Sequence, residues 1–388
     1  MSMSLGVLST YPPTQCGLAT FSRSLVTALQ WSATRKVGVV RVVDTVDDAP
    51  LPPVSSQWVR GSRDGFVAAA AALNRYDVAI IQHEYGIYGG RDGEDVLQVL
   101  RRLHVPVITV LHTVLVTPSA HQREILEELV DLSAVVVPMT QTGRRRLISH
   151  YSVDPAKIHV IPHGAVDNRS DGPELDNDGP PRILTWGLLG EGKGIEWAIE
   201  AMAQLRDVRP APLYSVVGQT HPRVLETKGE RYRDSLVARA QQLGVSDVVE
   251  FDARYLADDE LRRVVRQSDI VLLPYDSAEQ VTSGVLIEAI AAGKPVVSTA
   301  FPHAEELLST GAGLLVPRHD PSAIAHALRR VLTEPGLAKT MADEAQRLAP
   351  ALLWPAVVAQ YRAIAADALA ARSQRPATTL PSTELESA

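Results

Sequence analysis

The amino-acid sequence predicts an α/β protein built from two doubly wound domains that face each other across a deep cleft. Short β-branched runs alternate with segments of helical spacing along most of the 388 residues. A polar stretch rich in Asp, Gly and Pro, residues 169–181, divides the chain into two parts that are each about one domain long. Because strand–helix alternation is typical of parallel sheets covered by helices on both faces, each part should form one such sheet.

The expected strands are short and rich in Val, Ile and Leu. In the first part they cover residues 5–8, 37–43, 78–82, 105–111, 134–138 and 158–161. In the second part they cover residues 182–186, 214–217, 248–251, 270–273 and 295–298. Helical spacing separates them, as in Leu18, Phe21, Leu25 and Leu29 on one face of the first expected helix. We therefore expect a first domain over residues 1–168, a linker over 169–181 and a second domain over 182–350. Residues 373–388 are rich in Ser, Thr and Pro and should form a disordered tail.

Composition and charge exclude several classes of function. Apolar residues make up 45% of the chain and charged residues 21%, which is ordinary for a globular protein. The net charge of −7 argues against a broad nucleic-acid surface. No apolar window approaches the ~18 residues of a membrane-spanning helix, and the first residues lack the basic start of a secretory signal. Cys16 is the only cysteine, which rules out an internal disulfide. We expect a cytoplasmic enzyme or a binding protein for small ligands, with its oligomeric state open.

Ligands of open α/β sheets bind beyond the carboxyl ends of the strands. The first expected strand is followed by a turn that reaches Gly17, and then by a helix. Backbone N–H groups at a helix start can bind an anion, and Gly17 permits close approach. A purely structural turn has the same pattern, so both interpretations stay open. Cys16, in this turn, is expected to be a small buried residue rather than a reactive thiol.

Two further strands of the first part end in histidine. His83 is followed by Glu84 and Tyr85, and His112 follows the next strand. Each histidine is either a structural residue or a functional one at the sheet edge. His163 precedes the linker and should line the cleft between the domains. No pair has the spacing of a metal site such as HExxH, so we expect no bound metal.

The clearest chemistry lies in the second part. The strand at 182–186 runs into a loop that starts with Gly187 and Leu188, contains Lys193, and ends at a helix. A lysine beside a helix N-terminus can neutralise a diphosphate. The alternative is a solvated surface lysine.

A second segment with a chemical pattern follows the strand at 270–273. Thr282 or Ser283 can cap a helix that runs to residue 292, and Gly284 near its start leaves N–H groups free for a phosphate or a sugar hydroxyl. Glu288 lies within this otherwise apolar helix and needs partners. Paired ribose hydroxyls are suitable partners, and a structural salt bridge is the alternative.

Together these residues resemble the retaining glycosyltransferases of family 4 (group 1), which have the GT-B fold of two Rossmann-like domains. The resemblance runs from Tyr11 to about Ala366. The family's diphosphate loop corresponds to Gly187, Leu188, Lys193 and Gly194. Its segment with two glutamates separated by seven residues corresponds to Ser283, Gly284, Glu288, Ala289, Gly293, Pro295, Val296 and Val297. Residues 354–361 are similar to the C-terminal helix that crosses back, so residues 353–370 are expected to complete the first domain.

The sequence departs from the family pattern at two positions. The first glutamate of the pair falls at Gln280, with Glu279 beside it, and the basic residue usual after the first glycine of the diphosphate loop falls at Leu188. An amide still forms hydrogen bonds with a sugar hydroxyl. We expect Arg223 or Arg254, both near expected strand ends, to supply the missing charge. These departures leave open a protein that binds a sugar nucleotide without catalysis.

The resemblance implies a role for each candidate residue. Catalytic roles fall to His112, Lys193, Gln280 and Glu288. Donor contacts are expected from Gly17, Gly187, Leu188, Lys193, Gly218, Arg254, Thr282, Ser283, Gly284, Val285 and Glu288. Acceptor contacts are expected from Tyr11, His83, Glu84, Tyr85 and His163. No cofactor and no metal are implied, because the nucleotide-sugar donor is itself the substrate.

Three hypotheses follow from the sequence. The first is a hexosyltransferase that moves mannose or glucose from GDP-mannose or UDP-glucose to a hydroxyl of a sugar or glycoconjugate, with retention. The second is another enzyme on the same architecture, such as a nucleotide-sugar epimerase; a phosphorylase would need a much longer chain. The third is a non-catalytic sensor of sugar nucleotides, which the amide at Gln280 motivates.

Overall fold

The computed structural model describes residues 3–32, 36–48, 50–169 and 179–374. Within them, the first half of the chain forms one parallel sheet of six strands in the order β3-β2-β1-β4-β5-β6. These strands are β1 (Ser4–Ser9), β2 (Lys36–Val43), β3 (Val54–Val59), β4 (Val78–His83), β5 (Val107–Leu111) and β6 (Val135–Pro138). The order reverses beside β1, because the chain first fills one edge through β2 and β3 and then returns to the other side.

The second half repeats this topology. Its strands, counted over the described residues, are β7 (Arg182–Trp186), β8 (Leu213–Val217), β9 (Val249–Asp252), β10 (Ile270–Leu273), β11 (Val296–Thr299) and β12 (Gly313–Val316). Their order is β12-β11-β10-β7-β8-β9, with the reversal beside β7. Both sheets therefore have the doubly wound order, and the predicted fold class is confirmed.

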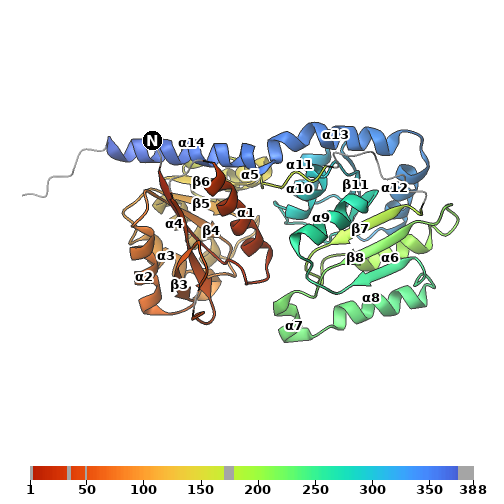
Figure 1. Ribbon diagram of the computed structural model, residues 1–388, viewed down its shortest axis with the longest axis horizontal. Helices are drawn as coiled ribbons and strands as arrows, with labels where there is room; N and C mark the ends of the chain where they lie inside the picture. The colour runs from red at the N-terminus through yellow and green to blue at the C-terminus, as the bar shows by residue number, and fades with distance from the viewer. Residues whose placement is uncertain (1–2, 33–35, 49, 170–178, 375–388) are drawn as a thin grey trace, which may run out of the picture.

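Helices connect the strands of each half. The first half has α1 (Gly17–Trp31), α2 (Arg63–Leu73), α3 (Asp95–Leu100), α4 (Ala120–Leu132) and α5 (Gln141–His150). The second half has α6 (Ile195–Ala203), α7 (Pro222–Lys228), α8 (Arg231–Gln242), α9 (Asp258–Gln267), α10 (Gly284–Ala291), α11 (Pro302–Leu308), α12 (Pro321–Thr333) and α13 (Leu337–Leu352). Two short 3-10 helices cover Arg91–Gly93 and Pro155–Lys157. Figure 1 shows the two sheets in separate lobes that lie side by side.

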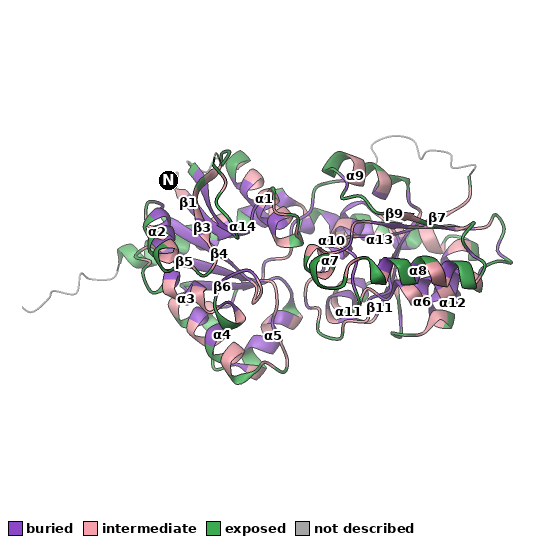
Figure 2. Ribbon diagram, turned by 90° about the horizontal axis from the view of Figure 1, so that it is seen from below, coloured by how far each residue is buried: buried purple, intermediate pink, exposed green. Residues whose placement is uncertain are grey.

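Burial explains why the strands read as continuous apolar runs. All six residues of β4 and all four of β10 are buried, because helices cover both faces of each parallel sheet. Figure 2 shows this buried interior along the strands, with exposed residues on the outer faces of the helices. On α1, the residues Phe21, Leu25 and Leu29 are buried, which is the face that the helical spacing predicts.

The last helix, α14 (Trp354–Ser373), returns to the first lobe (Figure 1). Trp354, Val357 and Tyr361 are buried in the same apolar cluster as Leu5 and Phe21 of the first lobe. The crossing is fixed by backbone hydrogen bonds between Ala165 and the segment that precedes α14. Two segments of the chain therefore connect the lobes side by side at one edge of the cleft.

Several expected bounds differ from the structure. Residues 158–161 form no strand: an isolated bridge joins Ile158 to Val136, and the N–H groups of His159 and Ile161 donate to carbonyls of β6, but this pairing is too short to continue the sheet. The strand β3 was not expected, since Ser55, Ser56 and Gln57 interrupt its apolar pattern. Residues 170–178 of the expected linker and 375–388 of the expected tail lie outside the described residues, and Ser373 ends α14 rather than starting a tail.

Candidate functional site

One cleft receives the carboxyl ends of strands from both sheets, and its volume is about 1550 Å³. The first half contributes Thr10, Arg41, Asp44, Glu84 and His112, and the second half contributes Gly187, Gly218, Gln280 and Glu288. Most of these residues lie at or just beyond the carboxyl ends of strands, which is where doubly wound sheets bind ligands, and Glu288 lies in α10. A ligand in the cleft therefore contacts both halves of the chain.

Two loops of the second half approach each other closely at the cleft. Gly187 follows β7 and Gly218 follows β8, and both have positive φ, 125° and 137°. A Cβ atom on Gly218 would lie 2.0 Å from the carbonyl oxygen of Gly187, so only glycine fits there. The N–H of Leu189 donates to the carbonyl of Gln219, and the N–H of His221 donates to the carbonyl of Leu189, both at 2.8 Å. The two loops form one wall of the cleft.

Lys193 brings a positive charge to this wall. Its loop ends at Gly194, where a Cβ atom would lie 1.8 Å from the carbonyl oxygen of Pro274. The Lys193 Nζ atom lies 4.5 Å from the centre of the Tyr275 ring, on which it forms a cation–π contact. Burial lowers the pKa of Lys193, and no carboxylate among the described residues offsets that effect. The charge of Lys193 is therefore available to an anionic ligand.

The start of α10 offers hydrogen-bond donors to the same space. Ser283 caps the helix, because its hydroxyl accepts from the N–H of Leu286 at 3.2 Å. The N–H of Ser283 itself donates to Nδ1 of His303 at 2.8 Å. The N–H groups of Gly284 and Val285 are left at the first turn, and both residues line the cleft. This helix start can bind a phosphate oxygen.

Glu288 lies in α10 just after its first turn, and it lines the cleft. The indole N–H of Trp186 donates to its carboxylate at 3.3 Å. Burial raises the pKa of Glu288 to about 7, and the nearby carboxylate of Asp258 adds to the rise, while Trp186 and Arg262 oppose it. Since the structure gives Glu288 no ion pair in the described residues that cancels this cost, the carboxylate is placed to accept hydrogen bonds from a ligand.

The loop before α10 carries Glu279 and Gln280, the two candidates for the position of the family's first glutamate. Gln280 lines the cleft and its amide N–H donates to the carbonyl of Thr282 at 3.1 Å. The carboxylate of Glu279 is instead held by Arg146 at 3.1 Å and by the N–H of Val116 at 3.3 Å, both in the first lobe. Gln280 is therefore the freer of the two side chains to contact a ligand.

His112 and His163 both pack against the ring of Phe21. The centre of the Phe21 ring is 4.9 Å from that of His112 and 4.8 Å from that of His163. Nε2 of His112 lies 2.7 Å from Oε1 of Gln82. Burial holds the pKa of His112 well below its usual value and lowers that of His163 to about 4. Both rings are thus neutral at neutral pH and suited to hydrogen bonding rather than to carrying charge.

Two family models match the chain with this site. The model described as glycosyl transferases group 1 matches residues 167–348, and the model described as glycosyltransferase family 4 matches residues 25–169. The chain belongs to the group 1 glycosyltransferases of family 4.

Individual relatives of this glycosyltransferase are similar over much of its length. D-inositol 3-phosphate glycosyltransferase of Corynebacterium glutamicum is 31% identical over 268 residues, which is 66% of this chain and 62% of that protein. The protein of the same name from Acidothermus cellulolyticus is 29% identical over 362 residues, 85% of this chain and 77% of that one. The chain spans less than two thirds of the length of the first relatives.

Solved structures share the architecture. HepE of Anabaena, in complex with UDP and glucose, has a TM-score of 0.73 and 17% identity, covering 94% of this chain and 100% of that one. Sucrose-phosphate synthase of Thermosynechococcus elongatus has a TM-score of 0.75 and 19% identity, covering 95% and 100%. At these identities the likeness shows the fold, which is the GT-B arrangement of two facing lobes.

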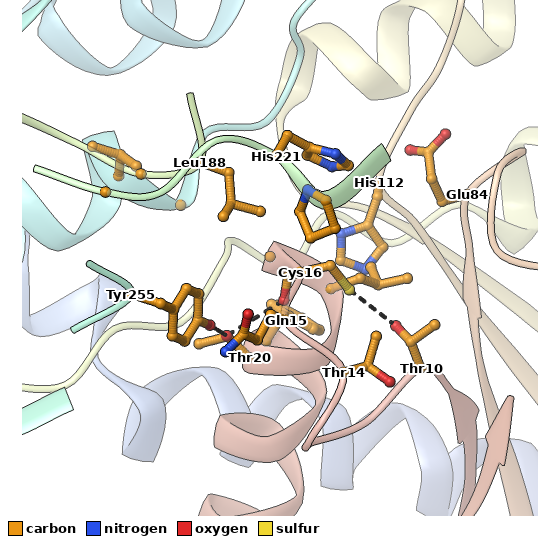
Figure 3. Close-up of a pocket in the computed structure, with 18 of the residues that line it drawn as sticks. Thr10, Thr14, Gln15, Cys16, Thr20, Glu84, His112, Leu188, His221 and Tyr255 are labelled. Carbon is orange, nitrogen blue, oxygen red and sulfur yellow. Dashed lines mark hydrogen bonds between the residues drawn. The ribbon is translucent and has the colours of Figure 1, made fainter. Parts of the chain in front are cut away.

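Most expected site residues of the glycosyltransferase line the cleft. The donor-side residues that do so are Gly17, Gly187, Leu188, Lys193, Gly218, Arg254, Thr282, Ser283, Gly284, Val285 and Glu288. Glu84 and His163 line it from the other side, as do His112 and Gln280. Figure 3 shows Glu84, His112, Cys16 and Gln15 of the first lobe drawn around the same space as Leu188 and His221 of the second. Cys16 is partly exposed in the cleft wall, where its Sγ caps α1 at Ala19.

Three residues expected to bind the acceptor do not line the cleft. Tyr11 and His83 are buried within the first lobe, and burial lowers the pKa of His83 to about 4. Tyr85 packs edge-on against His83, with ring centres 5.0 Å apart. Tyr85 lies in the turn after β4, where its hydroxyl donates to the carbonyl of Gln122, while Glu84 lines the cleft. The structure therefore does not place these three residues where we expected them to contact an acceptor.

The arginines that were candidates to replace a basic residue at Leu188 differ in their partners. Arg254 is held by Asp252, with Nη2 to carboxylate 2.6 Å, and by Glu260 at 3.0 Å. Arg223 lines the cleft and donates to the carbonyl of Gly86 in the first lobe. Because its positive charge is not tied to a carboxylate by an ion pair in the described part of the chain, Arg223 is the better placed of the two to meet an anion.

Several residues of the cleft were not expected from the sequence, among them three basic side chains. His221 follows β8 at a strand end, so the search of strand ends that singled out His112 had the means to find it. Arg41 and Arg60 lie at the carboxyl ends of β2 and β3, paired with Asp47 and Asp44. The signal of Arg60 was weak because β3 itself was not expected, whereas Arg41 lies inside an expected strand, where nothing local marks it as a cleft residue.

Neither a metal centre nor a membrane span is found in the part of the chain that the structure describes. No group of three or more His, Cys, Asp or Glu side chains there is arranged to hold a metal ion. No helix there is long and apolar enough to cross a bilayer. Catalysis without a divalent metal stays a prediction.

Proposed function

We propose that this chain transfers a hexose from a nucleoside diphosphate sugar to a hydroxyl group of a sugar or polyol acceptor. The observation that carries the proposal is the grouping of Lys193, the start of α10 and Glu288 on one wall of the cleft. A cation, a pair of free backbone donors and a carboxylate in this arrangement match a diphosphate joined to a ribose.

The donor lies along the second lobe in this proposal. Its diphosphate contacts Lys193 and the N–H groups of Gly284 and Val285, and its ribose hydroxyls donate to Glu288. The hexose then extends toward Gln280 and His112, where the two lobes meet. Support comes from the family membership and from the fold shared with HepE, which was solved with UDP and glucose.

Transfer with retention breaks the bond between the anomeric carbon and the diphosphate oxygen. The electron pair leaves with the diphosphate, whose growing charge Lys193 and the α10 start stabilise. The acceptor hydroxyl attacks from the face that the diphosphate leaves, and its proton passes to a departing phosphate oxygen. No residue of the chain needs to become a covalent nucleophile. The neutral ring of His112 positions the hexose or the acceptor.

The acceptor lies against the first lobe, whose cleft wall carries Glu84 and two arginine–carboxylate pairs, Arg41–Asp47 and Arg60–Asp44. Neighbouring donors and acceptors of this kind suit a polyol with several hydroxyls. The relatives from Corynebacterium and Acidothermus are named for an inositol phosphate acceptor. An inositol or inositol phosphate is therefore the first acceptor to test.

A sensor that binds the donor without turnover is the second candidate. It is favoured by one observation, the amide of Gln280 in place of a carboxylate. In this case the cleft would bind the nucleotide sugar and the lobes would close on it, but no product would form.

One experiment separates these functions. Purified protein is incubated with GDP-mannose and UDP-glucose, each with inositol, inositol phosphate and simple hexoses, with and without EDTA. We expect released nucleoside diphosphate and a new glycoside with one donor, at an unchanged rate in EDTA. Tight donor binding with no product from any pair would support the sensor, and a rate restored only by added magnesium or manganese would contradict metal independence.

A further inference from the structure

His221 lines the same cleft as Lys193 and the start of α10, and the function proposed above gives it no role. It follows β8 by way of residues 218–220, and it lines the cleft. A parallel bridge between Leu189 and Thr220 fixes its backbone alongside the loop that carries Leu188 and Lys193. Figure 3 shows His221 drawn near Leu188, which offers no polar atom to the cleft.

The hydrogen bonds of His221 define which ring nitrogen carries its proton. Nδ1 accepts from the backbone N–H of Arg223 at 3.2 Å, so it acts as the cap of α7. A neutral imidazole with Nδ1 as acceptor carries its proton on Nε2. Burial, with help from the charges of Arg223 and Lys193, lowers the pKa of His221, so that the neutral ring is the dominant form at neutral pH. The Nε2–H group is left as a donor in the cleft wall.

The loop that carries His221 is held rigidly from behind. The hydroxyl of Thr220 donates to Glu230, and Arg233 both pairs with Glu230 at 3.2 Å and donates to the carbonyl of Gly218 at 2.8 Å. Arg233 is buried, so this support is shielded from water. A donor that is held in place before the ligand arrives stabilises developing charge without reorganisation.

We propose that His221 is a catalytic residue that donates its Nε2–H hydrogen bond to the departing diphosphate. The inference rests on the proposed transfer from a nucleoside diphosphate sugar. As the bond from the anomeric carbon breaks, the electron pair moves to the phosphate oxygen, and the hydrogen bond from His221 strengthens with that charge. His221 keeps its proton throughout, because the acceptor hydroxyl supplies the proton that the phosphate receives. Lys193 and His221 then act on the leaving group together, from two bridged loops.

Two substitutions separate this role from the capping of α7. In His221→Asn, the side-chain oxygen occupies the place of Nδ1 and still accepts from Arg223, while the Nε2 donor is lost. We expect kcat to fall by on the order of 100-fold, as when one oxyanion donor is removed, with the thermal midpoint and the KM for the nucleotide-sugar donor little changed. His104→Asn, at an exposed histidine outside the cleft, is the matched control and should keep full activity.

A rescue experiment provides the decisive readout. Leu188 lines the cleft on the loop that the bridge joins to the His221 loop, so Leu188→Arg in the His221→Asn background should raise kcat at least ~10-fold by placing new donors at the diphosphate. Leu188→Ala in the same background should restore none. A kcat for His221→Asn within about 2-fold of the wild type, or a loss that Leu188→Ala repairs as well as Leu188→Arg, overturns the inference. If the wild type turns over no donor at all, the proposed function fails instead.

Discussion

The guanidinium of Arg146, on α5 of the first lobe, donates to the carbonyl of Glu279 at 2.8 Å and to its carboxylate at 3.1 Å. The same guanidinium nitrogen donates to the carbonyl of Val114 at 3.0 Å. The Arg146 side chain is 9% exposed and that of Glu279 is 48% exposed, so the pair lies at the closed edge of the cleft. A residue of the first lobe therefore holds the loop whose next residue, Gln280, faces the ligand.

From this contact we predict that Arg146 holds the loop with Glu279 and Gln280 in place when the two lobes are together. Replacing it in Arg146→Gln removes the ion pair and leaves the carbonyl of Glu279 with a weaker donor, so kcat should fall by about 10-fold, more than donor KM rises. Steady-state kinetics of Arg146→Gln, Glu279→Gln and the double variant test the coupling. We expect the double variant to be no slower than the slower single variant, and fully additive losses would show that the two residues act separately. Arg101→Gln, which breaks an exposed pair with Glu128 far from the cleft, is the control.

The cleft wall formed by Lys193, the start of α10 and Glu288 could be predicted from the sequence because its signals are local. Lys193 follows a strand and precedes a helix start within eight residues, and Glu288 interrupts an apolar helix, so both stand out without knowledge of the fold. Gly218, in contrast, is special only because its Cα lies against the carbonyl of Gly187 from another strand end. The resemblance to a family, rather than the local pattern, pointed to it.

The residues that escaped prediction depend on contacts between distant segments. Arg146 stands in the run Arg144-Arg145-Arg146, which reads as the solvated face of a helix, yet Arg146 alone is buried by a loop more than a hundred residues away. His83 and Tyr85 failed for the opposite reason. They lie at the end of β4 as expected, but His83 is buried and Tyr85 lies in a turn, so Glu84 is the residue of this segment that lines the cleft.

Closure of the lobes over the donor is a second prediction. In the structure the lobes already touch on both rims, through Arg146–Glu279 and through Arg23, whose guanidinium lies 2.6 Å from Asp258. The Arg23–Asp258 pair is exposed on both sides and contributes at most about 1 kcal/mol. The free protein should therefore open readily and close when a ligand bridges the cleft. Small-angle scattering should give a smaller radius of gyration with saturating GDP or UDP than without. The same radius in both, at a value that matches the closed structure, would mean that the lobes do not open.

The raised pKa of Glu288 predicts how stability changes with pH. Burial raises it from 4.5 to about 7, so between these values the folded state binds a proton that the unfolded state has released. The neutral acid therefore stabilises the fold most below pH ~5, and that contribution is lost as pH rises through about 7. Glu288→Gln should match the wild type at low pH and exceed it at pH ~8, by on the order of 1–3 kcal/mol. Urea unfolding of both proteins at the two pH values tests this, with the exposed Glu124→Gln as control. A difference between variant and wild type that is the same at both pH values would contradict it.

Gln280 and Glu288 are predicted to hold opposite ends of the donor, and their variants should fail in different ways. Glu288 lies about one turn into α10, eight positions after Gln280 in the preceding loop, so the two side chains cannot share one ligand atom. A ribose contact at Glu288 is made equally in the ground state and the transition state. Glu288→Gln should therefore raise donor KM about 10-fold or more with a smaller loss of kcat.

Gln280 faces the hexose, where a small displacement changes the alignment for attack. Gln280→Ala should lower kcat on the order of 100-fold and change the preference between mannose and glucose donors. Because Arg146 and Val116 hold the carboxylate of Glu279, that residue cannot take over the role without breaking the contact between the lobes. Gln280→Glu then decides between the two candidate functions. A several-fold gain in transfer would show that the amide is a weakened form of a catalytic carboxylate and would favour the sensor. A loss would show that this cleft is adapted to the amide, and an unchanged rate and donor preference in Gln280→Ala would remove Gln280 from the hexose site.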